Sequence, residues 1–174
     1  MALDITSSQL HIEFSELSNK TDFTGFDCGD QDLNDFVKDG TALKYQSQHL
    51  AFTTCLHIHG ELVGYYSIAA DALPLQGKAK DDVKEGVAIR NFPALKLARM
   101  AIKLKHQRNE LGRLVVSLVK GYALDLNKKG MAIRFITVDA YPHREKFYKN
   151  CGFIVNESQS RNRTTISMRC DIYK

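Results

Sequence analysis

The stretch from residue 95 to residue 140 constrains the fold more than any other part of the sequence. From Leu111 onward the apolar residues recur with helical spacing, which predicts an amphipathic helix lying on a sheet. The members of this stripe are Leu114, Val115, Leu118, Val119, Tyr122 and Leu126. An apolar run at 95–102 precedes the helix and a β-branched run at 133–140 follows it, and both predict strands. A strand, loop, helix and strand in this order indicate a chain that mixes helices with a sheet.

The N-terminal half predicts three more strands and one short helix. Alternating residues predict a strand at 8–17, and two runs rich in β-branched and aromatic residues, at 50–58 and 62–70, predict a pair of strands joined across residues 59–61. Between these segments, Asp30 is placed to cap a helix that carries Leu33, Phe36 and Val37.

The remaining segments predict a long loop and a helix followed by two strands. Residues 71–92 are rich in charges, contain proline and glycine and show no clear period, so we expect a long loop there. Pro142 is placed to open a short helix. Residues 152–155 and 166–170 then predict the last two strands.

Length and composition favour one globular domain over residues 1–174. The chain is 44% hydrophobic and 25% charged, and its formal net charge of +4 is compatible with anionic partners or with plain solubility. The four cysteines contain no C-x-x-C pair, which predicts reduced thiols and no metal site. The N-terminal residues show no basic region followed by an apolar run, so we expect a cytoplasmic protein.

The segment Gln107–Gly112 is the strongest candidate for chemistry. It lies between a predicted strand and the first turn of the strongest predicted helix, where backbone N–H groups lack partners and the helix dipole is positive. An anion such as pyrophosphate is favoured there, and Arg108 and Arg113 would add to the field. An ordinary solvated connection is the alternative.

The same segment resembles the acetyl-CoA-binding motif of the GNAT acetyltransferases, Q/R-x-x-G-x-G/A, with Gln107 and Gly112 at its first and last positions. Glu110 stands where the motif has its middle glycine. Downstream, Phe147-Tyr148-Lys149-Asn150-Cys151-Gly152-Phe153 resembles the family's F-Y-x-x-x-G-F signature. The resemblance implies the GNAT fold, in which helices flank a central mixed sheet of about six to seven strands, and it implies acetyl-CoA as cofactor.

Residue roles follow from the same resemblance. Tyr148 would protonate the departing thiolate as general acid. Backbone groups of Met100, Ala101 and Ile102 would bind the pantetheine arm. The phosphates would meet the residues that link strand to helix, which are Gln107, Arg108, Asn109, Glu110, Leu111, Gly112 and Arg113. The general base stays open, with Glu61, Glu85 and the histidines as candidates. For an α-amine with a pKa near 8, solvent can take the proton and no protein base is needed.

Shorter segments resemble the GNAT toxins of bacterial toxin–antitoxin modules, which acetylate the α-amine of aminoacyl-tRNA and stop translation. These are Phe26–Gly29 with Leu33–Phe36, Val63–Ile68 and Leu97–Ile102. The resemblance implies a ribbon-helix-helix antitoxin as partner and a homodimer. Phosphate contacts to tRNA need cations, and the candidates nearest the acceptor are Arg90, Arg99 and Lys96.

Two other functions remain open. An acetyltransferase acting on a small-molecule or protein amine would share the cofactor site and would use an acidic pocket, to which Asp81, Asp82 and Glu85 could contribute. A noncatalytic GNAT-like binding module is favoured by Glu110 and opposed by the intact Tyr148.

Overall fold

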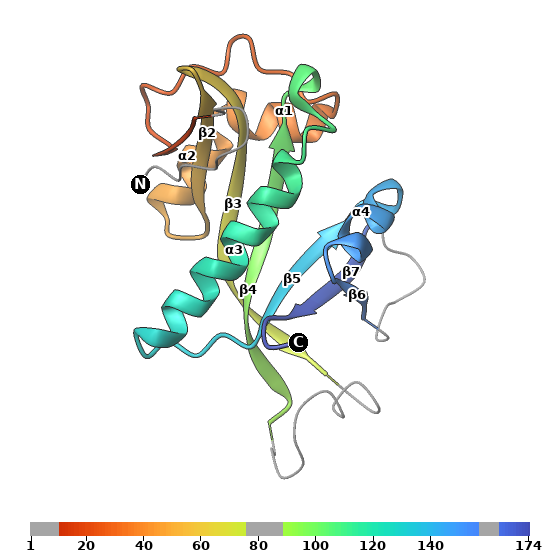
Figure 1. Ribbon diagram of the computed structural model, residues 1–174. Helices are drawn as coiled ribbons and strands as arrows, with labels where there is room; N and C mark the ends of the chain where they lie inside the picture. Colours follow the sequence, from red (N-terminus) through yellow and green to blue (C-terminus); the bar gives the residue numbers. More distant parts are fainter. Residues whose placement is uncertain (1–10, 76–88, 157–163) are drawn as a thin grey trace. The chain divides into compact units, whose positions relative to one another are not determined.

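The computed structural model describes residues 11–75, 89–156 and 164–174 (Figure 1). The predicted strand, loop, helix and strand are all present. They are β4 (Asn91–Ile102), the short 3-10 helix η2 (Leu104–His106), α3 (Leu111–Lys128) and β5 (Phe135–Ala140). Gly130 ends the helical region with a left-handed φ of 89°. β4 and β5 run parallel, with residues 94–96 opposite residues 135–137.

The other predicted elements are also found in the described residues. They are β1 (Ile12–Glu16), α1 (Gln31–Lys38), β2 (Phe52–Ile58), β3 (Glu61–Pro74), η3 (Pro142–Arg144), α4 (Glu145–Asn150), β6 (Ile154–Val155) and β7 (Ile166–Asp171). Seven strands form one mixed sheet in the order β1-β2-β3-β4-β5-β7-β6. The expected combination of helices with a mixed sheet of six to seven strands is therefore confirmed.

The structure differs from the prediction in one additional helix and in the ends of two strands. A second helix, α2 (Thr41–Ser47), was not predicted, because only Ala42 among its residues is buried and no apolar period marks it. β3 continues to Pro74 and β4 begins at Asn91, so both ends of the predicted loop 71–92 belong to strands. The middle of that loop, and residues 8–10 of the first predicted strand, lie outside the described residues.

The described residues form two compact units, and β3, β4 and α3 each pass from one to the other. The expectation of a single domain stays a prediction. The first unit comprises residues 11–69 and 98–115, and its core surrounds Tyr65. The rings of Phe23, Phe26 and Phe36 lie 5.7–6.3 Å from the Tyr65 ring, and the Tyr65 hydroxyl donates to the Leu33 carbonyl at 2.6 Å. This bond ties α1 to β3.

The β2–β3 hairpin of the first unit closes as expected. His59 and Gly60 both have a left-handed φ, of 49° and 76°. Two such residues between antiparallel strands form the turn whose twist matches a hairpin.

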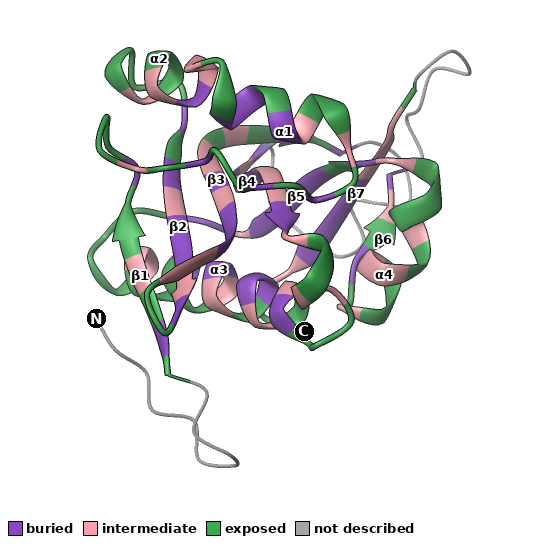
Figure 2. Cartoon of the chain, turned by 90° about the horizontal axis from the view of Figure 1, so that it is seen from above, coloured by how far each residue is buried: buried purple, intermediate pink, exposed green. Residues whose placement is uncertain are grey.

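The second unit comprises residues 70–75, 89–97, 116–156 and 164–174. β5 and β7 pair antiparallel along their whole length, and Figure 2 shows β5 coloured mostly as buried, next to the buried middle of β7. Ile136, Val138 and Met168 are at most 2% exposed. A second apolar cluster, next to Phe135, is formed by Leu73, Leu75, Phe92 and Ala94.

Two further features concern membrane-spanning helices and the cysteines. The described helices include none that is both long and apolar enough to cross a membrane. The four cysteines are free thiols, as predicted, and Cys28, Cys55 and Cys170 are buried. Burial raises the pKa of Cys55 to about 11, so this thiol is unreactive at neutral pH.

Candidate functional site

The connection between β4 and α3 leads into the first-turn backbone amides of α3. α3 begins at Leu111, and its first backbone bond in this turn runs from the Leu114 N–H to the Glu110 carbonyl at 2.9 Å. The N–H groups of Leu111, Gly112 and Arg113 therefore have no partner within the helix. Together with the positive end of the helix dipole, they favour an anion at this position.

Two residues of this connection adopt left-handed backbone conformations. Arg108 has φ of 65° and Glu110 has φ of 60°, while Asn109 between them does not. In anion-binding nests, left-handed residues of this kind turn successive N–H groups toward one side of the backbone. The left-handed φ of Glu110 also explains why the family motif has glycine there, since only glycine adopts it without strain.

The side chain of Gln107 ties this connection to neighbouring backbone segments. Its side-chain amide donates to the Cys28 carbonyl at 2.8 Å and to the Ile102 carbonyl at 2.9 Å. Both amide hydrogens are therefore used, and the backbone N–H donates to the Leu104 carbonyl at 3.1 Å. Because its N–H groups already have partners, Gln107 shapes the connection, and its predicted contact with the cofactor stays a prediction.

The turn that receives Gln107 is held by a buried asparagine that sequence reasoning missed. Asn34 is 7% exposed; its side chain accepts from the Cys28 N–H at 3.0 Å and donates to the Asp27 carboxylate at 2.9 Å. Asp27 also accepts from the Gly29 N–H, and these two bonds hold the pKa of Asp27 below its ordinary value. The sequence did contain one indication of this role, because Asn34 is a polar residue on the apolar face of a predicted helix.

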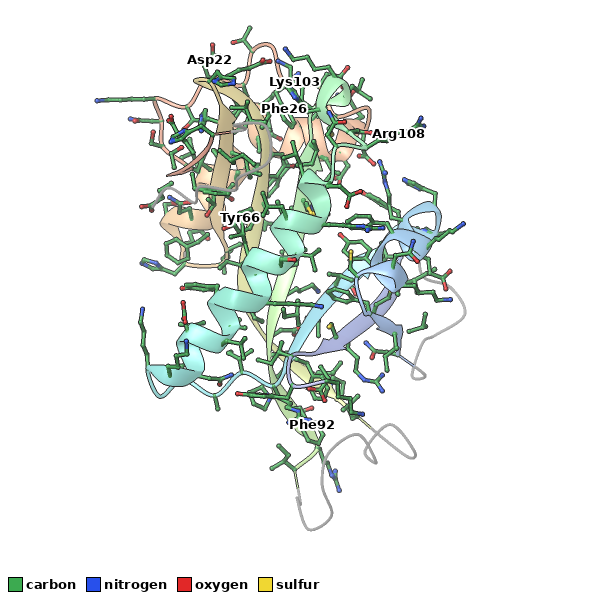
Figure 3. The ribbon with its side chains drawn as sticks, in the orientation of Figure 1. Asp22, Phe26, Tyr66, Phe92, Lys103 and Arg108 are labelled. Atoms are coloured by element: carbon green, nitrogen blue, oxygen red, sulfur yellow. The ribbon has the colours of Figure 1, made fainter. Side chains whose placement is uncertain are left out.

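Cations surround this connection, and carboxylates compensate part of them. Lys103 and Lys105 share Glu61, at 2.9 and 2.7 Å, while Arg113 pairs with Glu110 at 3.3 Å. Among the residues that the structure describes, Arg108 has no ion-pair partner, and Figure 3 marks it and Lys103 at either end of the connection. These four cations outnumber their two carboxylate partners, Glu61 and Glu110, and the excess positive charge suits a diphosphate.

The predicted pantetheine residues lie at the end of β4 in the same unit. Met100 is half-buried, whereas Ala101 and Ile102 are buried. Gly64 of β3 approaches so closely that a Cβ there would lie 2.8 Å from the Ala101 carbonyl oxygen and 2.7 Å from the Ile102 side chain. The backbone of β4 is therefore held tightly against β3 immediately before the anion-binding connection.

Tyr148 lies in the second unit, on the short helix α4. Its half-buried ring contacts Phe147 and Phe153 edge-on, with centroid distances of 5.0 and 5.4 Å. Burial raises the pKa of Tyr148 to about 12, and the neighbouring Cys151 adds to this shift. The phenol therefore stays protonated at neutral pH, which a hydrogen-bond donor to a developing thiolate requires.

The three cations predicted for the acceptor side have different surroundings. Lys96 pairs with Asp139 at 2.6 Å. Arg99 lies over the Phe36 ring at 5.4 Å and pairs with Asp32 at 3.8 Å, so it also ties β4 to α1. The Arg90 side chain is exposed.

Of the candidate bases, Glu61 is the least suited. Hydrogen bonds from Lys105 and Lys103 lower its pKa to about 2, so it holds a proton too weakly to act near neutral pH. Glu85, Asp81 and Asp82 lie outside the described residues.

Solved structures with this fold include toxins of toxin–antitoxin modules. A structure described as a bacterial toxin has a TM-score of 0.78 at 18% identity, over 95% of this chain and 93% of that chain. AtaT complexed with acetyl-methionyl-tRNAfMet has a TM-score of 0.74 at 21% identity, over 90% and 93%. A chain of the KacTA–DNA complex has a TM-score of 0.62 at 25% identity, over 91% and 92%.

Sequence comparison gives the family directly. No curated protein sequence matches this chain. The family model described as an acetyltransferase (GNAT) domain matches residues 27–170, which is most of the chain and includes both the β4–α3 connection and Tyr148. The chain therefore belongs to the GNAT acetyltransferase family and is an acetyl-CoA-dependent N-acetyltransferase.

Proposed function

We propose that this enzyme acetylates the α-amine of aminoacyl-tRNA, and so inhibits translation, as the toxin of a toxin–antitoxin module. The observation that carries the proposal is the likeness to AtaT, solved with acetyl-methionyl-tRNAfMet, over at least 90% of both chains. A toxin of this kind would act in the cytoplasm, where aminoacyl-tRNA is found.

The cation distribution supports a nucleic-acid acceptor. Besides the cations near the β4–α3 connection, the second unit carries Arg90, Arg144 and Lys146 as exposed side chains. Such side chains can pair with phosphates and release counterions. Lys96 and Arg99 would have to exchange their carboxylate partners for phosphate, whereas Arg90 has no ion-pair partner among the described residues. We therefore assign Arg90 the larger part of the phosphate contacts among the three predicted acceptor residues.

In the proposed mechanism the chain positions the donor and supplies a proton. Acetyl-CoA, when bound, provides the thioester that the acceptor amine attacks. The amides of residues 108–113, with Arg108 and Arg113, would hold the diphosphate, and the backbone of Met100–Ile102 would orient the pantetheine arm. The Tyr148 hydroxyl would donate its proton to the departing sulfur. A solved Tyr-to-Phe variant of KacT fits the choice of a tyrosine for this role.

The likeness to toxins also suggests protein partners. AtaT has been solved bound to the C-terminus of the antitoxin AtaR. We propose that this chain likewise has an antitoxin, of the ribbon-helix-helix type, and that it forms a homodimer.

Mass spectrometry of total aminoacyl-tRNA, incubated with enzyme and acetyl-CoA, tests the proposal. Acetylated α-amines should form with the wild type, and Tyr148→Phe should lower turnover by about two to four orders of magnitude while acetyl-CoA still binds. Tyr122→Phe is the matched control, because Tyr122 is exposed on α3 and 46% accessible. It should leave turnover unchanged.

The outcomes separate the alternatives. Acetyl-CoA binding with no acetylated tRNA would refute the toxin function and direct the search to small-molecule and protein amines. Full activity of Tyr148→Phe would remove Tyr148 from the mechanism while leaving the acceptor assignment intact.

A further inference from the structure

α4, the helix that carries Tyr148, is too short to fix its own position. It spans six residues, Glu145–Asn150, and none of them is buried. Helices of this length are marginal alone, and packing normally stabilises them. The orientation of the Tyr148 ring therefore depends on the few contacts that α4 makes with neighbouring elements.

One of these contacts is a charged hydrogen bond from α3. The Lys120 ammonium donates to the Cys151 carbonyl at 2.8 Å. Cys151 is the C-cap of α4, so its carbonyl belongs to the end of the helix where carbonyls lack intrahelical partners and the dipole is negative. A cation bonded there both satisfies the carbonyl and complements the dipole.

The same turn holds the backbone of Tyr148. The Tyr148 carbonyl accepts from the Cys151 N–H at 2.9 Å and from the Phe153 N–H at 3.0 Å. Gly152 lies between these donors with φ of 87°, and a Cβ on it would lie only 3.6 Å from the Lys120 ammonium. Lys120 is thus packed against the turn whose two N–H groups fix Tyr148, and Phe153 of this turn also contacts the Tyr148 ring.

We propose that Lys120 is a positioning residue, which holds the turn 151–153 and thereby sets the place of the Tyr148 hydroxyl during acetyl transfer. This inference rests on the proposed role of Tyr148 as general acid. Lys120 acts on the reaction through the backbone of α4. Loss of its ammonium should move the phenol, and a displacement of about 1 Å can lower a rate about a hundredfold.

Lys120→Met removes the donor and Lys120→Arg keeps one. The matched control is Lys128→Met, the same substitution on the same helix, where the side chain is 78% exposed and pairs with Asp125 at 3.1 Å. Lys120→Met should lower kcat about ten- to a hundredfold with the Kd for acetyl-CoA within about twofold of wild type. Lys120→Arg should recover most of the loss, and Lys128→Met should be unchanged.

A double-mutant test distinguishes positioning of Tyr148 from a general structural role. In the Tyr148→Phe background, Lys120→Met should change kcat less than about twofold, because the group that it positions is gone. An equal loss in both backgrounds, or a kcat for Lys120→Met equal to that of Lys128→Met, would overturn the proposal.

Hydrogen exchange gives a readout that needs no activity. Backbone amides of residues 151–153 should exchange about tenfold faster in Lys120→Met than in wild type or Lys128→Met. Unchanged exchange would overturn the proposal. If the wild type acetylates no aminoacyl-tRNA, the proposed function fails, and exchange still decides the role of Lys120.

Discussion

Replacing Glu110 by glycine tests the anion site most directly, because Glu110 departs from the family motif in both conformation and charge. Its φ of 60° costs a non-glycine residue about 1–2 kcal/mol, and glycine removes this strain while adding about 0.5–1 kcal/mol of unfolded-state entropy. Glu110→Gly should therefore raise the free energy of unfolding by up to about 1.5 kcal/mol. In a chain of this size each kcal/mol raises Tm by about 2–4 °C.

The effect on acetyl-CoA binding comes from charge. A carboxylate about 6 Å from one phosphate charge, in a solvent-exposed site with an effective dielectric near 80, is repelled by about 0.7 kcal/mol. Two phosphate charges double this value, and Arg113 also loses the carboxylate that now lies 3.3 Å from it. Glu110→Gly should therefore lower the Kd for acetyl-CoA about three- to tenfold at low ionic strength.

Calorimetry at low and high salt, with Glu110→Gln as a second variant, separates charge from strain. Glutamine removes the charge and keeps the strained backbone, so it should gain affinity without gaining stability. The gain of both variants should shrink in about 1 M salt, where the Debye length is only about 3 Å and more distant charges are screened from one another. Weaker binding by both variants would refute the reasoning and show that the ion pair with Arg113 holds the connection in its binding conformation.

Three further expectations follow from single contacts. Gly64→Ala should destabilise the protein by about 1–3 kcal/mol in urea unfolding, because its Cβ would meet the Ala101 carbonyl oxygen at 2.8 Å, and an unchanged midpoint would contradict this packing. Asp30→Ala should cost about 1 kcal/mol, measured as Tm, since the Asp30 carboxylate accepts from the Leu33 N–H at 3.2 Å and caps α1. Because the pKa of Tyr148 is raised to about 12, the protonated phenol is present below that pH and lost above it, so kcat should show no fall between pH 7 and 10; a fall there that Tyr148→Phe abolishes would contradict the assignment.

Local patterns predicted most of the fold, and they failed where a segment has no period. The stripe on α3 predicted that helix, and an Asp in front of an apolar pattern predicted the cap of α1. Tyr122 was expected in the buried stripe but is 46% exposed, whereas Val116 and Ala123 are buried. The buried face is shifted by about one residue from the predicted one, because spacings of three and four fit two adjacent faces almost equally well.

The site was predictable only where its residues follow one another in the chain. The β4–α3 connection and the segment around Tyr148 are continuous, so spacing and resemblance found them. The bonds that hold them join distant positions: Gln107 and Cys28 are 79 residues apart, and Lys120 and Cys151 are 31 apart. The sequence showed that Glu110 departs from the motif. Only the structure showed why the motif has glycine at this position, namely that the backbone there is left-handed.

The class of acceptor depends on which group takes the proton of the amine. With a pKa of about 2, Glu61 lies about six units below an α-ammonium group and more than eight below a lysine side chain. A histidine, with an ordinary pKa near 6.5, is within two units of the first and about four units from the second. An acceptor can also bind already neutral, and at pH 7 about one α-amine in ten is neutral against about one lysine in 2,500. This difference of about 250-fold is worth about 3 kcal/mol, so an enzyme that relies on neutral acceptor discriminates in favour of α-amines, the kind that the proposed aminoacyl-tRNA acceptor presents.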